Sequence, residues 1–108
     1  MNSLGLVEVQ STTAAIDCLD IMCKAADVSF VTWERKLGGR LVTVIVEGSI
    51  SAVQAAVDAA NGAIIKPAAS AVIASPHSET ERMVLLSASR LNKKQAKPAK
   101  SEQYLQEV

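Results

Sequence analysis

Two stretches of the chain repeat polar residues every three or four positions, and their placement restricts the fold more than any other feature of the sequence. In the first stretch these residues are Asp17, Asp20, Lys24 and Asp27. In the second they are Gln54, Asp58 and Asn61. Most positions between them are small or aliphatic, and Ser11 and Ser49, which suit helix N-caps, precede the two stretches. Each stretch therefore predicts an amphipathic helix with a broad apolar face.

Apolar segments typical of β-strands lie around these two helices. They span residues 4–10, 28–35, 41–47 and 70–76, and Gly38-Gly39 supplies a turn between the second and the third. The order β-α-β-β-α-β indicates an α+β fold of the ferredoxin-like, split βαβ type. Such a fold has a four-stranded antiparallel sheet with both helices on one face.

The two middle strands carry apolar residues on both faces. Strict alternation in 28–35 places Phe30 on one face and Val31 with Trp33 on the other, and 41–47 is apolar on both sides as well. A sheet face in contact with water does not need this pattern. The second face is therefore expected to be covered, either by the C-terminal segment or by a neighbouring subunit.

The C-terminal part changes character along its length. Residues 78–81, Ser-Glu-Thr-Glu, form a capping-box pattern that predicts a short helix through about Leu86. Beyond it the chain is polar, basic and nearly free of apolar residues. We expect a domain over residues 1–88 and a flexible basic tail over residues 89–108.

The composition excludes some classes of partner. The 108 residues contain 11 Lys and Arg against 11 Asp and Glu, so no global positive field attracts nucleic acid or an anionic membrane. No apolar run approaches the roughly 18 residues that span a bilayer. The sequence predicts a single domain in the cytoplasm, without a nucleic-acid or membrane partner.

Residues that could carry out chemistry are few. Cys18 and Cys23 do not form a metal-binding motif, and both are interpreted as small buried apolar residues. His77 is the chain's one histidine, and no carboxylate or oxyanion donor accompanies it locally. No nucleotide-binding or catalytic motif is present. We therefore expect neither an enzyme nor a cofactor.

The segment 35–40, Arg-Lys-Leu-Gly-Gly-Arg, places three cations and two glycines at the tip of an apolar hairpin. Two hypotheses explain it from the residues alone. In one, the chain is a small regulatory module whose cationic hairpin holds an anionic metabolite. In the other, the hairpin and the apolar second face belong to an assembly of identical subunits.

Four segments resemble one known family. "LGLVEVQ" at residue 4 is similar to that family's opening strand, "AAIDCLDIMCKAADV" at 14 to its first helix, "LVTVIVEGSISAVQAAVDA" at 41 to its third strand and second helix, and "VIASPH" at 72 to its "VIPRPH". Spaced in this order from residue 4 to about 86, they resemble the single-domain, hexamer-forming shell proteins of bacterial microcompartments.

The resemblance implies a non-enzymatic shell subunit in the bacterial cytoplasm, where shells of such subunits enclose metabolic enzymes. It implies a cyclic hexamer with a central pore through which metabolites pass. The partners it implies are further copies of the chain, other shell proteins and the enclosed enzymes. The residues that match the pore loop are Arg35, Lys36, Leu37, Gly38, Gly39 and Arg40.

The resemblance also implies a set of contacts at the hexamer edge. Lys24 matches the family's edge lysine, Asp20 lies one turn before it, and His77 matches the histidine of the "PRPH" element. Three features depart from the family pattern. The pore loop is longer and more charged, the stretch 61–70 is shorter, and Ser75 replaces an edge arginine. These departures leave a flat sheet, an open, helical or swapped assembly, and a minor shell component as alternatives.

Overall fold

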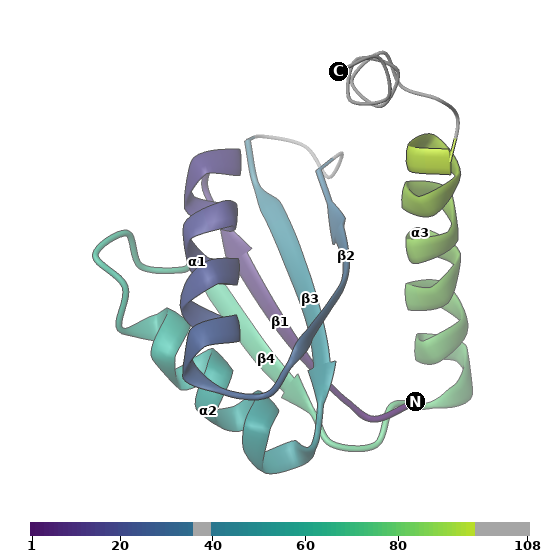
Figure 1. Ribbon diagram of the computed structural model, residues 1–108, viewed down its shortest axis with the longest axis horizontal. Helices are drawn as coiled ribbons and strands as arrows, with labels where there is room; N and C mark the ends of the chain where they lie inside the picture. The colour runs from purple at the N-terminus through teal and green to yellow at the C-terminus, as the bar shows by residue number, and fades with distance from the viewer. Residues whose placement is uncertain (36–39, 97–108) are drawn as a thin grey trace, which may run out of the picture.

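The structure is a computed structural model that describes residues 1–35 and 40–96, and it has the predicted split βαβ order (Figure 1). Its strands are β1 (Ser3–Val9), β2 (Ser29–Glu34), β3 (Val42–Gly48) and β4 (Ala69–Ile73). Its helices are α1 (Thr12–Ala25), α2 (Ile50–Asn61) and α3 (Ser78–Ala96). The strands form one antiparallel sheet in the order β2-β3-β1-β4, which confirms the predicted fold class. Within the described ranges, no helix has the length and apolar character needed to cross a membrane.

Helices α1 and α2 begin at the serines that the sequence indicates. Ser11 Oγ accepts the backbone N–H of Ala14 at 3.1 Å, and Ser49 Oγ accepts that of Ala52 at 3.2 Å. Each bond satisfies one of the N–H groups that have no partner in the first turn of a helix.

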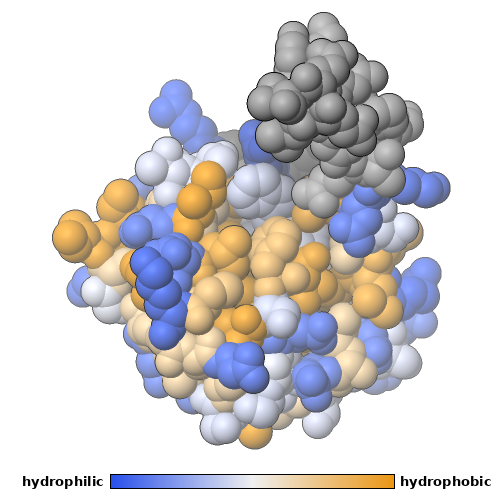
Figure 2. Space-filling view, viewed as in Figure 1, coloured by the Kyte–Doolittle hydropathy of each residue, from blue (hydrophilic) through white to orange (hydrophobic). Residues whose placement is uncertain are grey.

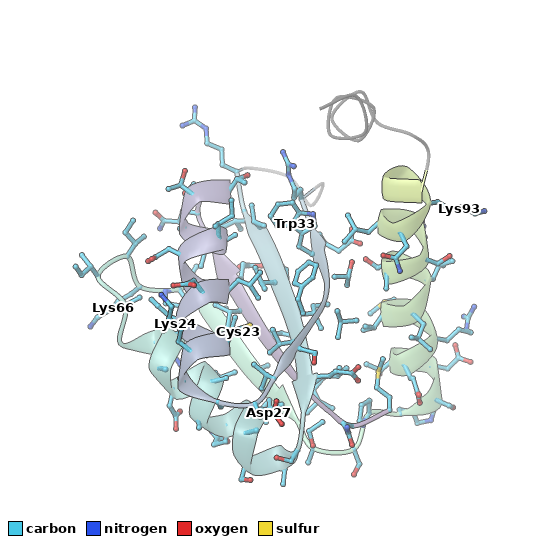
Figure 3. All side chains as sticks on the ribbon, viewed as in Figure 1. Cys23, Lys24, Asp27, Trp33, Lys66 and Lys93 are labelled. Carbon is cyan, nitrogen blue, oxygen red and sulfur yellow. The ribbon has the colours of Figure 1, made fainter. Side chains whose placement is uncertain are left out.

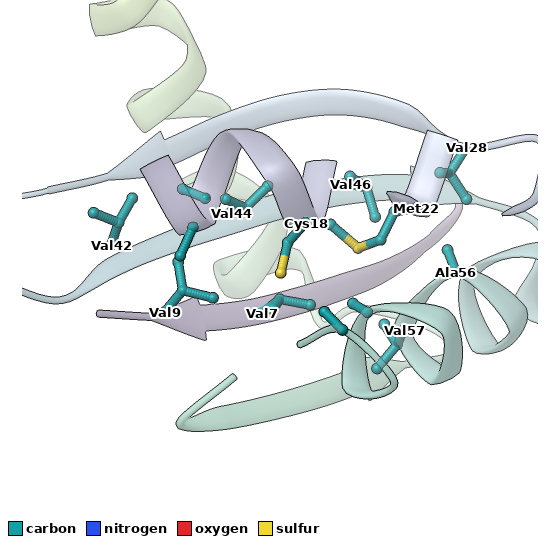
Figure 4. Close-up of a cluster of buried hydrophobic side chains, with 14 of the residues drawn as sticks. Val7, Val9, Cys18, Met22, Val28, Val42, Val44, Val46, Ala56 and Val57 are labelled. Carbon is teal, nitrogen blue, oxygen red and sulfur yellow. The ribbon is translucent and has the colours of Figure 1, made fainter. Parts of the chain in front are cut away.

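Both helices pack against one face of the sheet and form the main core with it (Figure 4). The buried side chains are mostly valines from the strands and alanines from the helices, and the small alanines permit close approach. Gly5 on β1 shows how close α2 lies. A Cβ atom at Gly5 would be 2.9 Å from Val53 Cγ1 and 3.0 Å from Val57 Cγ2.

The two cysteines differ. Cys18 is buried in the core beside Met22, as predicted (Figure 4), whereas Cys23 is exposed, so its predicted burial was wrong. Cys23 is five residues from Cys18, about 140° around the helix axis, which turns its side chain away from the sheet. Burial raises the pKa of the Cys18 thiol, and the nearby Asp17 charge adds to this effect.

A register shift in β2 overturns the alternation expected there. Phe30 pairs with Val46, but Thr32 pairs with the next residue back along β3, Ile45. Because of this bulge, Val31 and Thr32 both face away from α1 and α2, and Trp33 returns to their side. Phe30 and Trp33 therefore share a face, with ring centroids 6.4 Å apart in an edge-to-face arrangement, and the prediction of opposite faces was wrong.

The second face of the sheet is covered in part by the chain's own α3. Val84 of α3 is buried against Leu4 of β1 and Ile45 of β3, which are 0% and 6% exposed. The C-terminal segment, one of the two alternatives expected for this face, therefore covers part of it.

The length and the cap of α3 also differ from expectation. The helix continues to Ala96, ten residues past the predicted end near Leu86. Its first turn is capped by His77, whose Nδ1 accepts the Glu79 N–H at 3.1 Å, and not by a capping box at Ser78. The boundary predicted between a domain over 1–88 and a tail over 89–108 stays a prediction, and residues 97–108 lie outside the described ranges.

Candidate functional site

The described part of the candidate pore loop consists of Arg35 and Arg40, which follow β2 and precede β3 at the same end of the sheet (Figure 1). Both arginines are exposed. The other predicted loop residues, Lys36, Leu37, Gly38 and Gly39, lie outside the described residues. The structure thus brings the first and last residues of the predicted loop together.

Arg35 is held against an aromatic ring. Its guanidinium carbon lies 5.3 Å from the centre of the Trp33 ring, a distance typical of a cation–π contact. Trp33 is half-buried and packs against the core, and Figure 3 shows it on β2 near the end that leads into the loop. The ring therefore gives the Arg35 charge a fixed support on the helix-covered side of the sheet.

A hollow of about 310 Å³ lies beside the two arginines. Its lining residues are Gln10, Ser11, Thr12, Arg35, Arg40 and Val42. Cationic and hydroxyl groups dominate this lining, so its chemistry suits an anionic or polar solute better than an apolar one.

A polar cluster that sequence reasoning missed connects α3 to the end of β2. Ser87 of α3 donates its hydroxyl proton to the Glu34 carboxylate, and its oxygen lies 2.9 Å from the Thr32 hydroxyl. Thr32 is fully buried, and Glu34 is half-buried. Nothing in the local sequence signals this cluster, because Ser87 is 53 positions from Glu34.

The candidate edge residues form two separate groups. Asp20 and Lys24 form an exposed ion pair with 2.7 Å between the carboxylate oxygen and Nζ, as the predicted spacing requires. The hydrogen bond from Asp20 and the charge of its carboxylate raise the pKa of Lys24. Ser75 and His77 lie in the exposed connection from β4 to α3. Within the described residues, no hydrogen bond or ion pair joins the two groups.

Large apolar side chains reach the surface in several places, and part of this surface is visible in Figure 2. Ile16 lies on the same side of α1 as Asp20 and Lys24, since each is four residues from the next. Ile64, in the connection from α2 to β4, is wholly exposed, and its neighbour Ile65 is 48% exposed. A contiguous patch of exposed apolar groups is typical of surfaces that are buried on assembly, whereas single exposed apolar residues are common on any protein.

No metal site is evident: across residues 1–35 and 40–96, no group of three or more His, Cys, Asp or Glu side chains is placed to bind an ion. The positions that remain for function are therefore the cationic loop, the exposed edge residues and the α3 cluster.

Comparison with known proteins gives consistent matches. The model of the BMC domain family matches residues 3–76. The bacterial microcompartment shell protein PduA of Citrobacter freundii is 44% identical over 85 residues, which cover 76% of this chain and 90% of PduA. The carboxysome shell protein CsoS1C of Hydrogenovibrio crunogenus is 40% identical over 88 residues, covering 78% of this chain and 85% of that protein.

A solved structure agrees with these sequence matches. The crystal structure of a microcompartments protein from Desulfitobacterium hafniense DCB superposes with a TM-score of 0.68 at 27% sequence identity. The match covers 81% of this chain and 48% of that one, so this chain spans about half of its length.

Proposed function

The chain belongs to the BMC-domain family of bacterial microcompartment shell proteins, and from this premise we propose that it forms a cyclic hexamer whose central pore favours anionic solutes. As a member of this family it is a structural shell subunit and not an enzyme, and its place in the cell is the shell of a microcompartment. Shell proteins assemble with other shell proteins. Which of them this chain contacts, and whether enclosed enzymes are among its partners, are part of the proposal.

The observation that carries the proposal is the pair of exposed arginines at the two ends of the candidate loop. In a hexamer with this end of the sheet at the axis, each subunit would bring Arg35 and Arg40 towards the same opening. Charges in water are screened over about 10 Å at 0.1 M salt. A narrow opening with low-dielectric walls focuses the field of a ring of charges, and this raises the local concentration of anions.

The cation–π contact adds to this argument. A free arginine side chain samples many rotamers, so its charge is spread over a large volume. Arg35 is held on Trp33, and Trp33 is packed against the core. The charge is therefore positioned by the fold of the subunit, which is what a selective opening requires.

The edge of the hexamer is proposed at the exposed side of α1 and at the connection from β4 to α3. Lys24 is presented there with its ammonium oriented by Asp20, and Ile16 supplies apolar surface on the same side of the helix. Ser75 and His77 would contribute from the connection. A serine at position 75 offers a single hydroxyl where an arginine would offer a bidentate donor, so lateral contacts should be weaker than with arginine.

The first experiment determines the assembly. Native mass spectrometry and negative-stain images of the purified chain should show a hexamer with a central hole, and a compact monomer in dilute buffer would contradict the proposal.

The second experiment tests the selectivity of the pore. Hexamers inserted into a planar lipid bilayer under a KCl gradient give the anion-to-cation permeability ratio from the reversal potential. Arg35→Gln and Arg40→Gln should each lower this ratio. Lys66→Gln, which removes an exposed charge on the opposite side of the molecule from α3 (Figure 3), is the matched control and should leave it unchanged.

The alternative function, a module that holds an anionic metabolite, is favoured by the hollow of about 310 Å³ beside Arg35 and Arg40. It predicts saturable binding of inorganic phosphate or a small carboxylate to the unassembled subunit, lost in the Arg35→Gln/Arg40→Gln variant. Isothermal titration calorimetry at low protein concentration separates this outcome from a pore that works only in the assembled ring.

A further inference from the structure

Glu34 and Arg35 are neighbours in the sequence at the base of the candidate loop, but the structure separates their charges. The Arg35 guanidinium lies on the Trp33 ring, on the side of the sheet that α1 and α2 cover. The Glu34 carboxylate lies on the opposite side, where it accepts the hydroxyl proton of Ser87 from α3. Within the described residues, Glu34 has no ion-pair partner.

The bulge in β2 produces this separation. With strict alternation from Phe30, Trp33 would face α3 and Glu34 would face α1 and α2. The extra residue at Val31–Thr32 moves both side chains to the other face. Trp33 then supports Arg35 from the core side, while Glu34 points towards α3.

Ser87 is itself held in a defined orientation. A serine hydroxyl has one proton, and Ser87 donates it to Glu34, so the Thr32 hydroxyl donates in the 2.9 Å contact with Ser87, in preference to the Trp33 carbonyl oxygen at 3.5 Å. Thr32 is fully buried on β2, and Val84, one turn before Ser87, is buried against the sheet. The position of α3 thus fixes the hydroxyl that binds Glu34.

We propose that Ser87 is a positioning residue for the pore: it holds the Glu34 carboxylate on the face where the bulge places it, away from the loop, and so preserves the positive charge of Arg35 at the opening. Arg35 and Glu34 are adjacent at the end of β2. A carboxylate released from Ser87 can there be hydrated by water or form an ion pair with one of the exposed arginines, Arg35 or Arg40. Pairing with either arginine would cancel one positive charge in every subunit. The inference rests on the proposed pore, and it makes α3 a determinant of selectivity for carboxylate or phosphate solutes.

The test uses the full-length chain as assembled hexamers, with the anion-to-cation permeability ratio as the readout. Ser87→Ala should lower the ratio by at least about twofold. This is the Boltzmann factor for the interaction in water between a permeating anion and a released carboxylate about 8 Å from it. Ser87→Thr keeps the hydroxyl and should retain the wild-type ratio. Ser89→Ala, two residues further on α3 and exposed, is the matched control and should leave the ratio unchanged.

A second variant distinguishes positioning from a structural role. Adding Glu34→Gln to Ser87→Ala removes the released charge and should restore the ratio to at least the wild-type value. If α3 merely loosens in Ser87→Ala and distorts the pore, Glu34→Gln will not restore it, and that result overturns the proposal.

The two proposals fail in different ways. If Arg35→Gln lowers the ratio and Ser87→Ala does not, the pore stands and the role of Ser87 is refuted. If neither variant changes the ratio, the cationic pore is refuted, and the role of Ser87 falls with it.

Discussion

The substitution Gly5→Ala tests how closely α2 packs on the sheet. The added methyl group would lie 2.9 Å from Val53 Cγ1, 3.0 Å from Val57 Cγ2 and 3.2 Å from Val46 Cγ2, and all three valines are buried. Overpacking of a core costs about 1–3 kcal/mol. Replacing glycine recovers about 0.5–1 kcal/mol of backbone entropy. We therefore expect a net loss of about 1 kcal/mol, within a range of about 0–2.5 kcal/mol, in the free energy of unfolding.

A double-mutant cycle with Val53→Ala makes the prediction specific. Val53→Ala alone removes two buried methyl groups and should cost about 2 kcal/mol. If the clash at Gly5 is the cause, the shorter side chain makes room for the new methyl group. The double variant should then be about 1 kcal/mol more stable than the sum of the single effects predicts. The contact with Val57 persists, so the rescue should be partial.

The assay is urea unfolding followed by the fluorescence of Trp33, the chain's one tryptophan. All four proteins must be measured at one protein concentration, because assembly couples stability to concentration. Val57→Ala in the Gly5→Ala background provides a second cycle at the neighbouring contact. Strict additivity in both cycles would show that α2 moves away freely, and it would refute the close-packing argument.

Three further predictions use exposed or loop residues. A thiol reagent at neutral pH should modify the exposed Cys23 quickly, whereas the buried Cys18 should react only on unfolding. Burial, and secondarily the charge of Asp17, raise the pKa of Cys18 in the folded protein. The stability that its neutral thiol provides is therefore present at neutral pH and declines as the pH rises towards the folded-state pKa. Fast reaction of both thiols would contradict this. Lys24→Ala should reduce the extent of lateral sheets in electron micrographs while native mass still shows the hexamer, and sheets of normal extent would remove Lys24 from the edge. Gly39→Asp should reduce or reverse the anion preference without unfolding the subunit, which an unchanged reversal potential would disprove.

The helices of the main domain were predictable because their signals are local. The polar stripe along α1 and the serine caps of α1 and α2 depend on residues within one or two turns, and the structure confirms them. The end of α3 was not predictable in this way. Beyond Leu86 the composition is polar, and what keeps Ser87 on a packed helix is a pair of hydroxyl and carboxylate partners on β2, more than fifty positions away.

The faces of β2 show a different limit. Alternation assigns each side chain correctly only until an extra residue shifts the register, and the segment around Val31 contains no glycine or proline that would mark a bulge. The error changes the site, because it exchanges the sides of Trp33 and Glu34. The cationic ends of the loop could be predicted from the sequence, but the separation of Arg35 from Glu34 required the fold.

Coverage of the second sheet face by α3 changes the argument for assembly. If Leu4 and Ile45 had been bare, they would have required a neighbouring subunit, but Val84 buries them within one chain. The apolar groups that stay in water include Ile16 on the outer side of α1 and Ile64 in the connection from α2 to β4. They also include Met83, Leu85 and Leu86 on α3 itself. Burying one such side chain contributes about 1.5–3 kcal/mol, so contacts between subunits should form where these residues lie. Ile16 lies on the same side of α1 as Lys24. The free energy gained by burying Ile16 and the proposed hexamer edge therefore belong to one surface of the subunit.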